Sequence, residues 1–200
     1  MDELAHTAGI DPVESRLRHM QDHRARQVIQ LVATKFGWPR PPRERNRGVG
    51  FAFGRYKNLM AYVAIAIDIS VVPETDQVTL DHAEVAVDAG QVVSPDGIRN
   101  QIEGGIVQAA SWTLYEALKY DTQRIRSFDW SSYPILRFGA APQSIKVHLI
   151  NRPGAPFLGA AEASMGPTAG ALANAVFDAT GQRLREMPFA GDGLRKRIDA

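Results

Sequence analysis

The sequence predicts an α+β domain in which an antiparallel or mixed sheet packs against helices. Over residues 61–72, large apolar residues occupy alternate positions, a spacing typical of a strand. Over residues 98–119, apolar residues recur at every fourth position, a spacing typical of a helix. The elements follow one another as helices, two strands, a helix, a strand and a helix. This order differs from the regular strand and helix alternation of a doubly wound sheet.

Two helices are expected before the first strand. Residues 11–14 read Asp-Pro-Val-Glu, which supplies a capping residue, a proline for the first helical position and an acid three residues after the cap. This helix should run to about residue 20. A second helix is expected over residues 24–36, and Gly37 is placed to end it.

The segment over residues 38–47 contains three prolines and is strongly basic, so we expect an extended connector. The chain is therefore divided into a helical segment with its basic, proline-rich connector, residues 1–46, and an α+β domain, residues 47–200. The alternative interpretation of the connector is a nucleic-acid patch. No interleaved aromatic residues or nucleic-acid motif support it, so no nucleic-acid partner is expected.

A second strand is expected over residues 78–88, joined to the first by a turn in an antiparallel hairpin. Its apolar phase shifts along the strand, which predicts a bulge near His82. The remaining expected elements are a helix, a strand, an irregular loop and a helix, over residues 98–119, 145–149, 151–161 and 169–179.

The composition excludes several classes of site. The chain of 200 residues is 44% hydrophobic with a net charge of +1, as expected of a globular protein with no general affinity for nucleic acid or membrane surfaces. It has no cysteine, which excludes a disulfide, a cysteine-ligated zinc and an iron–sulfur cluster within this chain. No signal peptide is expected, and the apolar run over residues 61–67 is far shorter than the roughly 20 residues of a membrane helix.

The first candidate site lies on the helix over residues 98–119. Gln101, Gly104, Gly105 and Gln108 form a Gln-x-x-Gly-Gly-x-x-Gln pattern there. Glycine inside a helix costs about 1 kcal/mol relative to alanine, so something should approach the helix closely enough to require it. The glycines alone favour the backbone of another segment over a ligand, although an amide such as Gln101 is able to donate and accept hydrogen bonds.

The second candidate is Glu162, an acid among small and apolar residues just before the last expected helix. Burial in such surroundings raises the pKa of a carboxylic acid, which suits a general base. The alternative is a functionally silent anion that interacts with the helix dipole. Taken alone, the residue favours the silent anion.

Several further segments occur in a characteristic order. They read Asp-Glu-Leu-Ala at 2–5, Asp-Pro-Val-Glu at 11–14, Arg-Gly-Val-Gly at 47–50, Tyr-Pro-Ile-Leu-Arg-Phe at 133–138, Asn-Arg-Pro at 151–153 and Gly-Ala-Ala-Glu at 159–162. With the glutamine and glycine helix, this set resembles the C-terminal part of the molybdopterin-binding large subunit in the xanthine dehydrogenase/aldehyde oxidase family. It is most similar to the bacterial group that includes isoquinoline 1-oxidoreductase.

The resemblance implies a role for each candidate residue. Glu162 corresponds to the base that removes a proton from the hydroxide on molybdenum. Gln101 corresponds to the glutamine that hydrogen-bonds an oxo-type ligand of the metal, and Gly104, Gly105, Gln108 and Ala161 are expected at the cofactor. No side chain is expected to ligate the metal, because the pterin dithiolene holds it. The expected cofactor is molybdenum–molybdopterin cytosine dinucleotide, bound in the parent complex.

The sequence departs from the family pattern around the acid. Ala161 stands where glycine is common, and Ala163 and Ser164 stand where prolines are common. These changes place the substrate in doubt more than the chemistry.

The expected parent is larger than this chain. The family's large subunit has several times more chain ahead of this region, so we expect the C-terminal part of a molybdenum hydroxylase that is inactive alone. Its partners would be the remaining N-terminal part of that subunit, a 2Fe-2S subunit or domain, and an aldehyde or N-heterocycle substrate, in the cytoplasm or periplasm of a bacterium. Apolar surface exposed on the isolated chain should cause self-association. The alternative is a non-catalytic interaction or structural domain that retains the fold.

Overall fold

The computed structural model describes residues 1–39, 46–72, 74–75 and 77–189. Residues 40–45 of the basic connector lie outside the described residues, so its extended conformation stays a prediction. The division of the chain at residue 46 likewise stays a prediction.

A four-stranded sheet forms the centre of the fold, with its strands in the order β1-β2-β3-β4. The strands are β1 (Arg47–Arg55), β2 (Tyr62–Val72), β3 (Gln77–Asp88) and β4 (Ser144–Leu149). The first three pair antiparallel, whereas β4 pairs parallel to β3. The prediction of a mixed α+β sheet is confirmed.

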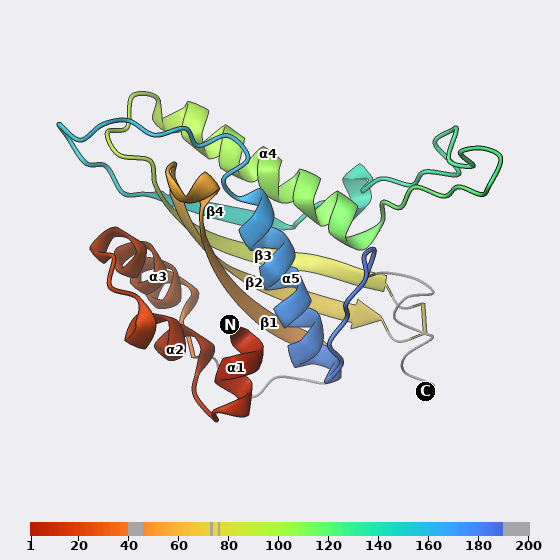
Figure 1. The fold of residues 1–200 in the computed structure, drawn as a ribbon, viewed down its shortest axis with the longest axis horizontal. Helices are drawn as coiled ribbons and strands as arrows, with labels where there is room; N and C mark the ends of the chain where they lie inside the picture. The colour runs from red at the N-terminus through yellow and green to blue at the C-terminus, as the bar shows by residue number, and fades with distance from the viewer. Residues whose placement is uncertain (40–45, 73, 76, 190–200) are drawn as a thin grey trace.

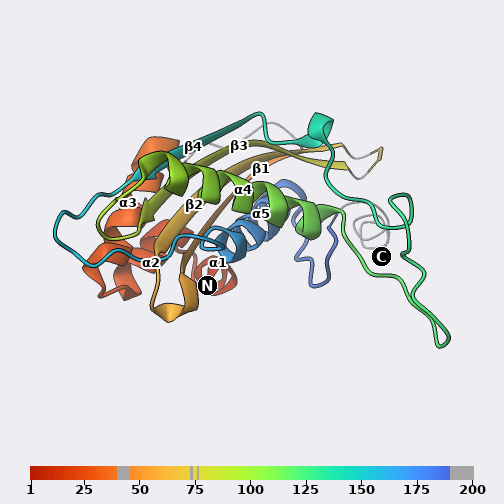
Figure 2. The same cartoon turned by 90° about the horizontal axis from the view of Figure 1, so that it is seen from above.

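Helices cover both faces of this sheet (Figures 1 and 2). On one face lies α3 (His23–Phe36), preceded by α1 (Asp2–Thr7) and α2 (Pro12–His19). On the other lie α4 (Pro95–Leu114) and α5 (Met165–Thr180). None of the helices in the described part of the chain combines the length and apolarity that a membrane crossing requires.

The two faces of β2 explain why both sides are covered. Its large side chains, such as Ile65 and Ile67, lie in the core beneath α4 and α5. Its small ones, Ala64 and Ala66, lie in the core beneath α3, where they let the helix approach closely. The β2–β3 hairpin is confirmed, and its register shifts between Asp68 and Ile69, which is opposite the predicted bulge.

The expected helix over residues 98–119 is displaced. It starts at Pro95, where the Ser94 side chain caps it, and ends at Leu114, so the last predicted turn is wrong. Just after the end of the helix, Ser111 and Tyr133 both donate hydrogen bonds to the Glu116 carboxylate, which holds residue 116 out of a further helical turn.

Two glycines let α5 lie directly on β1. A Cβ atom on Gly50 would lie 1.9 Å from the carbonyl oxygen of Ala171, and one on Gly48 would lie 2.1 Å from that of Ala175. Such distances are well inside van der Waals contact, so a side chain at either position would push the helix away from the strand. This close approach holds α5 against β1, and the turn that carries Glu162 immediately precedes this helix.

A buried carboxylate joins three segments at the end of β3. Asp88 is fully buried and accepts hydrogen bonds from Arg24 on α3, from Arg152 in the loop after β4 and from the Gly90 backbone N–H. Burial by itself opposes the charged form, but these donors outweigh it and hold the pKa of Asp88 below its ordinary value.

A second buried acid holds the edge strand β4. The two Glu84 carboxylate oxygens lie 2.7 Å from His82 Nε2 and 2.5 Å from His148 Nε2. His82 and Glu84 belong to β3 and His148 to β4, so the carboxylate joins the two parallel strands on the α3 face of the sheet.

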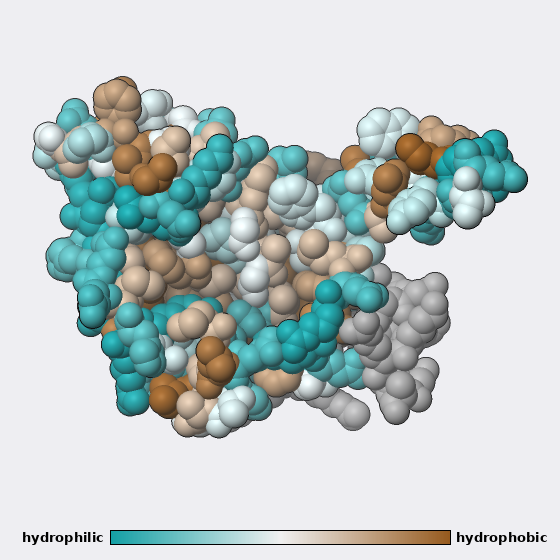
Figure 3. Space-filling model, viewed as in Figure 1, coloured by the Kyte–Doolittle hydropathy of each residue, from teal (hydrophilic) through white to brown (hydrophobic). Residues whose placement is uncertain are grey.

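Residues 115–137, here called the arm, project beyond the end of α4 (Figure 1). Several of their large apolar side chains are exposed, and Phe138 at the base of the arm is 99% exposed. Figure 3 shows apolar side chains on this projecting part of the surface. The exposed residues in and beside the arm include Tyr120, Ile125, Phe128, Trp130 and Phe138.

Replacing Gly50 with alanine should destabilise the protein by about 3 kcal/mol or more, because the methyl group meets the backbone of α5. Gly170→Ala is the matched control at the same interface, since its Cβ would lie 3.5 Å from the Ala52 Cβ, an ordinary contact. Urea unfolding monitored by circular dichroism measures both. Equal midpoints for the two variants would contradict the close-approach argument.

Asp88→Asn should remove a pH-dependent part of the stability. A carboxyl whose pKa is lowered by folding stabilises the folded state above its unfolded pKa of about 3.9, and this contribution is lost as the pH falls through the lower folded value. The difference in urea midpoint between wild type and Asp88→Asn should therefore be largest near neutrality and shrink in acid. Asp96→Asn, at an acid whose side chain is 93% exposed, is the matched control for the loss of one carboxylate. A difference in urea midpoint between wild type and Asp88→Asn that does not change with pH would refute this account.

The isolated chain should self-associate and bind a hydrophobic dye through the arm. Replacing both Trp130 and Phe138 with serine should reduce both effects, because these side chains are exposed. Leu4→Ser, at an exposed apolar residue of α1, should change neither. Size-exclusion elution with light scattering reports the association. Monomeric elution of the wild type without dye binding would argue against the prediction.

Candidate functional site

Glu162 lies in a tight turn, residues 161–164, immediately before α5. Its φ angle is +61°, in the left-handed region that non-glycine residues rarely adopt. Such a conformation costs on the order of 1 kcal/mol and persists where the surroundings hold it. Here the Ser164 hydroxyl donates to the Ile102 carbonyl on α4 at 3.0 Å, and the Ala163 N–H donates to the Ala160 carbonyl at 3.2 Å.

The Glu162 side chain is exposed, so the expectation that small and apolar neighbours bury it is wrong. The turn directs the carboxylate outward, while Ala163 and Ser164 fill the interior instead. The Tyr56 hydroxyl donates a hydrogen bond to Glu162 Oε2. This hydrogen bond and the charge of the carboxylate raise the pKa of Tyr56 above its ordinary value, although the nearby Lys57 ammonium acts in the opposite direction.

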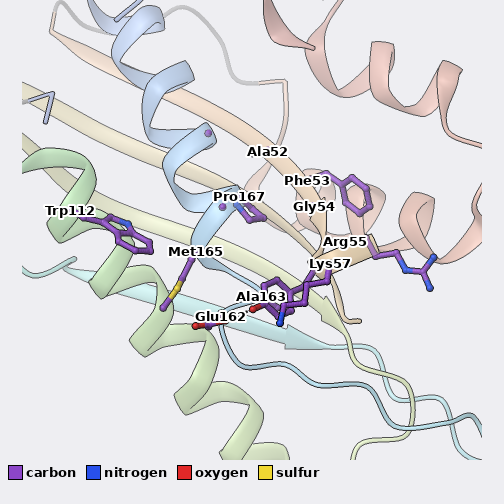
Figure 4. A pocket seen from close by; sticks show the side chains of 13 residues that line it. Ala52, Phe53, Gly54, Arg55, Lys57, Trp112, Glu162, Ala163, Met165 and Pro167 are labelled. Atoms are coloured by element: carbon purple, nitrogen blue, oxygen red, sulfur yellow. Dashed lines mark hydrogen bonds between the residues drawn. The ribbon is translucent and has the colours of Figure 1, made fainter. Parts of the chain in front are cut away.

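A cavity of about 570 Å³ opens beside this pair, within the size range of small-molecule sites. Its walls come from the end of β1, the short helical turn Tyr56–Asn58, α4 and the start of α5 (Figure 4). Glu162 lies beside α4, whereas the Arg55 side chain points away from Glu162. The wall includes the side chains of Tyr56, Lys57, Trp112, Glu162 and Met165.

The two adjacent glycines of α4 differ in their surroundings. A Cβ on Gly105 would lie 2.4 Å from Ser164 Oγ, so this glycine is required by the close approach of the turn. A Cβ on Gly104 would meet nothing within 4 Å. Packing against another backbone segment, the explanation that the sequence favoured, thus accounts for Gly105. It does not explain Gly104.

The other candidate residues lie on an exposed stripe of α4. Gln101, Gly104 and Gln108 are exposed and follow at helical steps of three and four, and Trp112 continues the stripe into the cavity wall. Gly105 joins this helix to the turn that carries Glu162. The structure therefore brings the glutamine and glycine helix and the acidic turn together, although Gln101 and Gln108 do not line the cavity itself. Ala161 is exposed at the start of the turn.

This stripe fits a group that is held by hydrogen bonds. Exposed amides at Gln101 and Gln108 flank a glycine position that a side chain would otherwise fill, and amides both donate and accept. Within the described residues, no group of three or more His, Asp or Glu side chains is placed to hold a metal ion. The exposed amides and the open glycine position between them thus suit a ligand that both donates and accepts hydrogen bonds.

Sequence reasoning did not find Tyr56 or Lys57. They follow β1 in the chain, about a hundred residues before Glu162, and no local pattern singles them out. Trp112 lies on the same helix as the glutamine and glycine pattern, but its place in the cavity wall depends on the position of α5.

Comparisons with known proteins agree with this architecture. Residues 2–142 match the model of the molybdopterin cofactor-binding domain, a stretch that contains the α4 stripe but ends before Glu162. Solved structures with the same fold include quinoline 2-oxidoreductase from Pseudomonas putida 86, with a TM-score of 0.64 and 23% identity over 70% of this chain and 19% of that one. Another is aldehyde oxidoreductase from Desulfovibrio gigas, with a TM-score of 0.61 and 23% identity over 70% of this chain and 16% of that one.

Two curated relatives align with nearly the whole chain. One subunit of the nicotinate dehydrogenase of Pseudomonas putida is 37% identical over 99% of this chain, and the beta subunit of the isoquinoline 1-oxidoreductase of Brevundimonas diminuta is 31% identical over 94%. The chain spans 18% and 24% of the lengths of these two proteins. The resemblance drawn from the ordered motifs is confirmed: the chain belongs to the molybdopterin cofactor-binding domain family.

Proposed function

We propose that this chain is the part of a molybdenum hydroxylase that places a carboxylate base beside the molybdopterin cofactor. The observation that carries the proposal is the position of Glu162. It is the one acid among the described residues of the cavity wall, and its turn packs through Gly105 directly on α4, the helix that carries the stripe. A base must lie within hydrogen-bond reach of the proton it removes, and the exposed carboxylate is free to meet a substrate or water in the cavity.

Each residue then has a role toward the cofactor. Gln101 and Gln108 would hydrogen-bond it, and Gly104 and Ala161 would allow its close approach. Gly105 would keep the turn against the helix. When bound, the cofactor would supply the metal centre and the two-electron oxidation. Glu162 would accept the proton that a water molecule gives up in the cavity. The cytosine dinucleotide form of the cofactor is part of the proposal.

The substrate would be an N-heterocycle or an aldehyde. The names of the two curated relatives, nicotinate dehydrogenase and isoquinoline 1-oxidoreductase, support the heterocycle. The cavity is large enough for one aromatic ring system, and Trp112 and Met165 give it apolar wall area.

The proposed activity needs other polypeptide segments. The chain has no cysteine, so an iron–sulfur relay would have to come from a 2Fe-2S subunit or domain. The remaining N-terminal part of the molybdenum subunit would supply further contacts to the cofactor, and the isolated chain would be inactive. A bacterial parent in the cytoplasm or periplasm completes the proposal.

A second candidate is a non-catalytic interaction or structural domain that retains the fold. The alanines at positions 161 and 163, where the family pattern has glycine and proline, favour it. The exposed apolar residues of the arm would then serve protein contacts alone. Molybdenum analysis of the complex purified from the native host distinguishes the two functions.

Glu162→Gln in the complete enzyme should lower kcat at least about a hundredfold, because the amide cannot accept the proton. Molybdenum and pterin content should remain near one equivalent, since the fold and the α4 stripe are unchanged. Glu14→Gln, at an exposed acid of α2, is the matched control and should leave turnover intact. Full turnover by a molybdenum-loaded Glu162→Gln enzyme would exclude the proposed base. A wild-type complex without molybdenum would favour the structural domain.

A further inference from the structure

We propose that Tyr56 is a positioning residue for Glu162, whose hydroxyl fixes the direction of the carboxylate in the cavity. The proposal rests on the proposed function of Glu162 as a base. In the described part of the chain, Tyr56 is the one hydrogen-bond donor that reaches this carboxylate. It engages Oε2 and leaves Oε1 available to accept a proton.

The turn fixes the backbone of Glu162 but not its side chain. The hydrogen bonds of Ala163 and Ser164 hold the main chain in its left-handed conformation. An exposed glutamate otherwise samples several rotamers, each of which moves the carboxylate by ångströms. The Tyr56 hydroxyl selects one of them, at the cavity wall.

Tyr56 is itself well placed for this task. Its backbone N–H donates to the Ala61 carbonyl at 3.0 Å, and its carbonyl accepts from the Met60 N–H at 2.8 Å, which closes the loop between β1 and β2. The Ala61 N–H donates to the Gly159 carbonyl at 3.3 Å. This bond ties the Tyr56 loop to the segment that leads into Glu162, so the two side chains come from mutually anchored backbones.

Lys57 adds a second influence on the phenol. Its ammonium lies 5.2 Å from the centre of the Tyr56 ring. The Tyr56 hydroxyl is protonated at neutral pH, as any ordinary phenol is, and its raised pKa extends this donor state to more alkaline pH. Lys57, Tyr56 and Glu162 all line the same cavity, so the two charges face it with the phenol between them.

A direct test measures the contact in this chain without cofactor. The ultraviolet difference titration between wild type and Tyr56→Phe reports Tyr56 among the five tyrosines. Its pKa should lie above 10, and in a Glu162→Gln background it should fall toward the ordinary value of about 10. A Tyr56 pKa near 10 that does not respond to Glu162→Gln would overturn the proposal.

The second test uses the complete enzyme. Tyr56→Phe keeps the ring and should lower kcat roughly 10- to 100-fold with KM nearly unchanged, because a base displaced by about 1 Å loses rate rather than binding. In a Glu162→Gln background the same change should have almost no further effect. Tyr133→Phe is the matched control: its hydroxyl also bonds a glutamate, Glu116 at 2.9 Å, but at the arm, and it should leave kcat intact.

The outcomes separate the two proposals. If Glu162→Gln lowers kcat and Tyr56→Phe does not, the base stands and the positioning role fails. If the titration shows the coupling but neither variant changes kcat, the proposed function fails instead. If Tyr56→Phe lowers kcat and raises KM by similar factors, and also lowers the urea midpoint, the role of Tyr56 is merely structural. That result would overturn the positioning proposal.

Discussion

The buried charge of Asp88 is the constraint on which the geometry of the site depends. The loop over residues 150–164 contains no strand or helix of its own, so its path is set by what it contacts at the end of β3. Arg152 bonds the Asp88 carboxylate, and the Leu158 N–H donates to the Ala89 carbonyl. A fully buried carboxylate is stable only where hydrogen-bond donors surround it. Moving Arg24 or Arg152 away would leave the charge of Asp88 without a partner, so the acid holds both side chains in place. The same carboxylate therefore ties α3 to the loop that leads to Glu162.

The fold was predictable where local pattern and tertiary packing agree. The alternation of β2 and β3 survives because each face meets a different helical layer. The end of α4 was not predictable, since the apolar spacing continues to Leu118 while Glu116 is drawn away by Ser111 and Tyr133. Strand β1 carries glycines where α5 crosses it, and glycines weaken the sequence pattern of a strand. Their presence is explained only by the helix that packs on them. Helix α1, at six residues, is too short for periodicity to reveal.

The candidate site divides in the same way. Gly104 and Gly105 look equivalent in the sequence, yet one meets Ser164 and the other meets open space. Only the position of a segment about sixty residues later distinguishes them. Glu162 was singled out as a candidate by its isolation among small residues together with the family resemblance. Its exposure was not predictable, because it follows from the left-handed turn. No sequence pattern indicated Tyr56, since its candidate role depends on a hydrogen bond to Glu162, 106 residues later in the chain.

The exposure of Glu162 has a consequence for the proposed chemistry. A base and a charge-transferring site work best where water is excluded, because fixed dipoles then act in a low dielectric. Here the carboxylate, the α4 stripe and the cavity all lie open at the surface of the chain. On the proposed function, the remaining surface of the pocket has to come from the rest of the parent subunit and from the cofactor itself. The internal contacts of this chain, from Asp88 to Gly105 and Tyr56, would then keep half of the site in position before the other half is added.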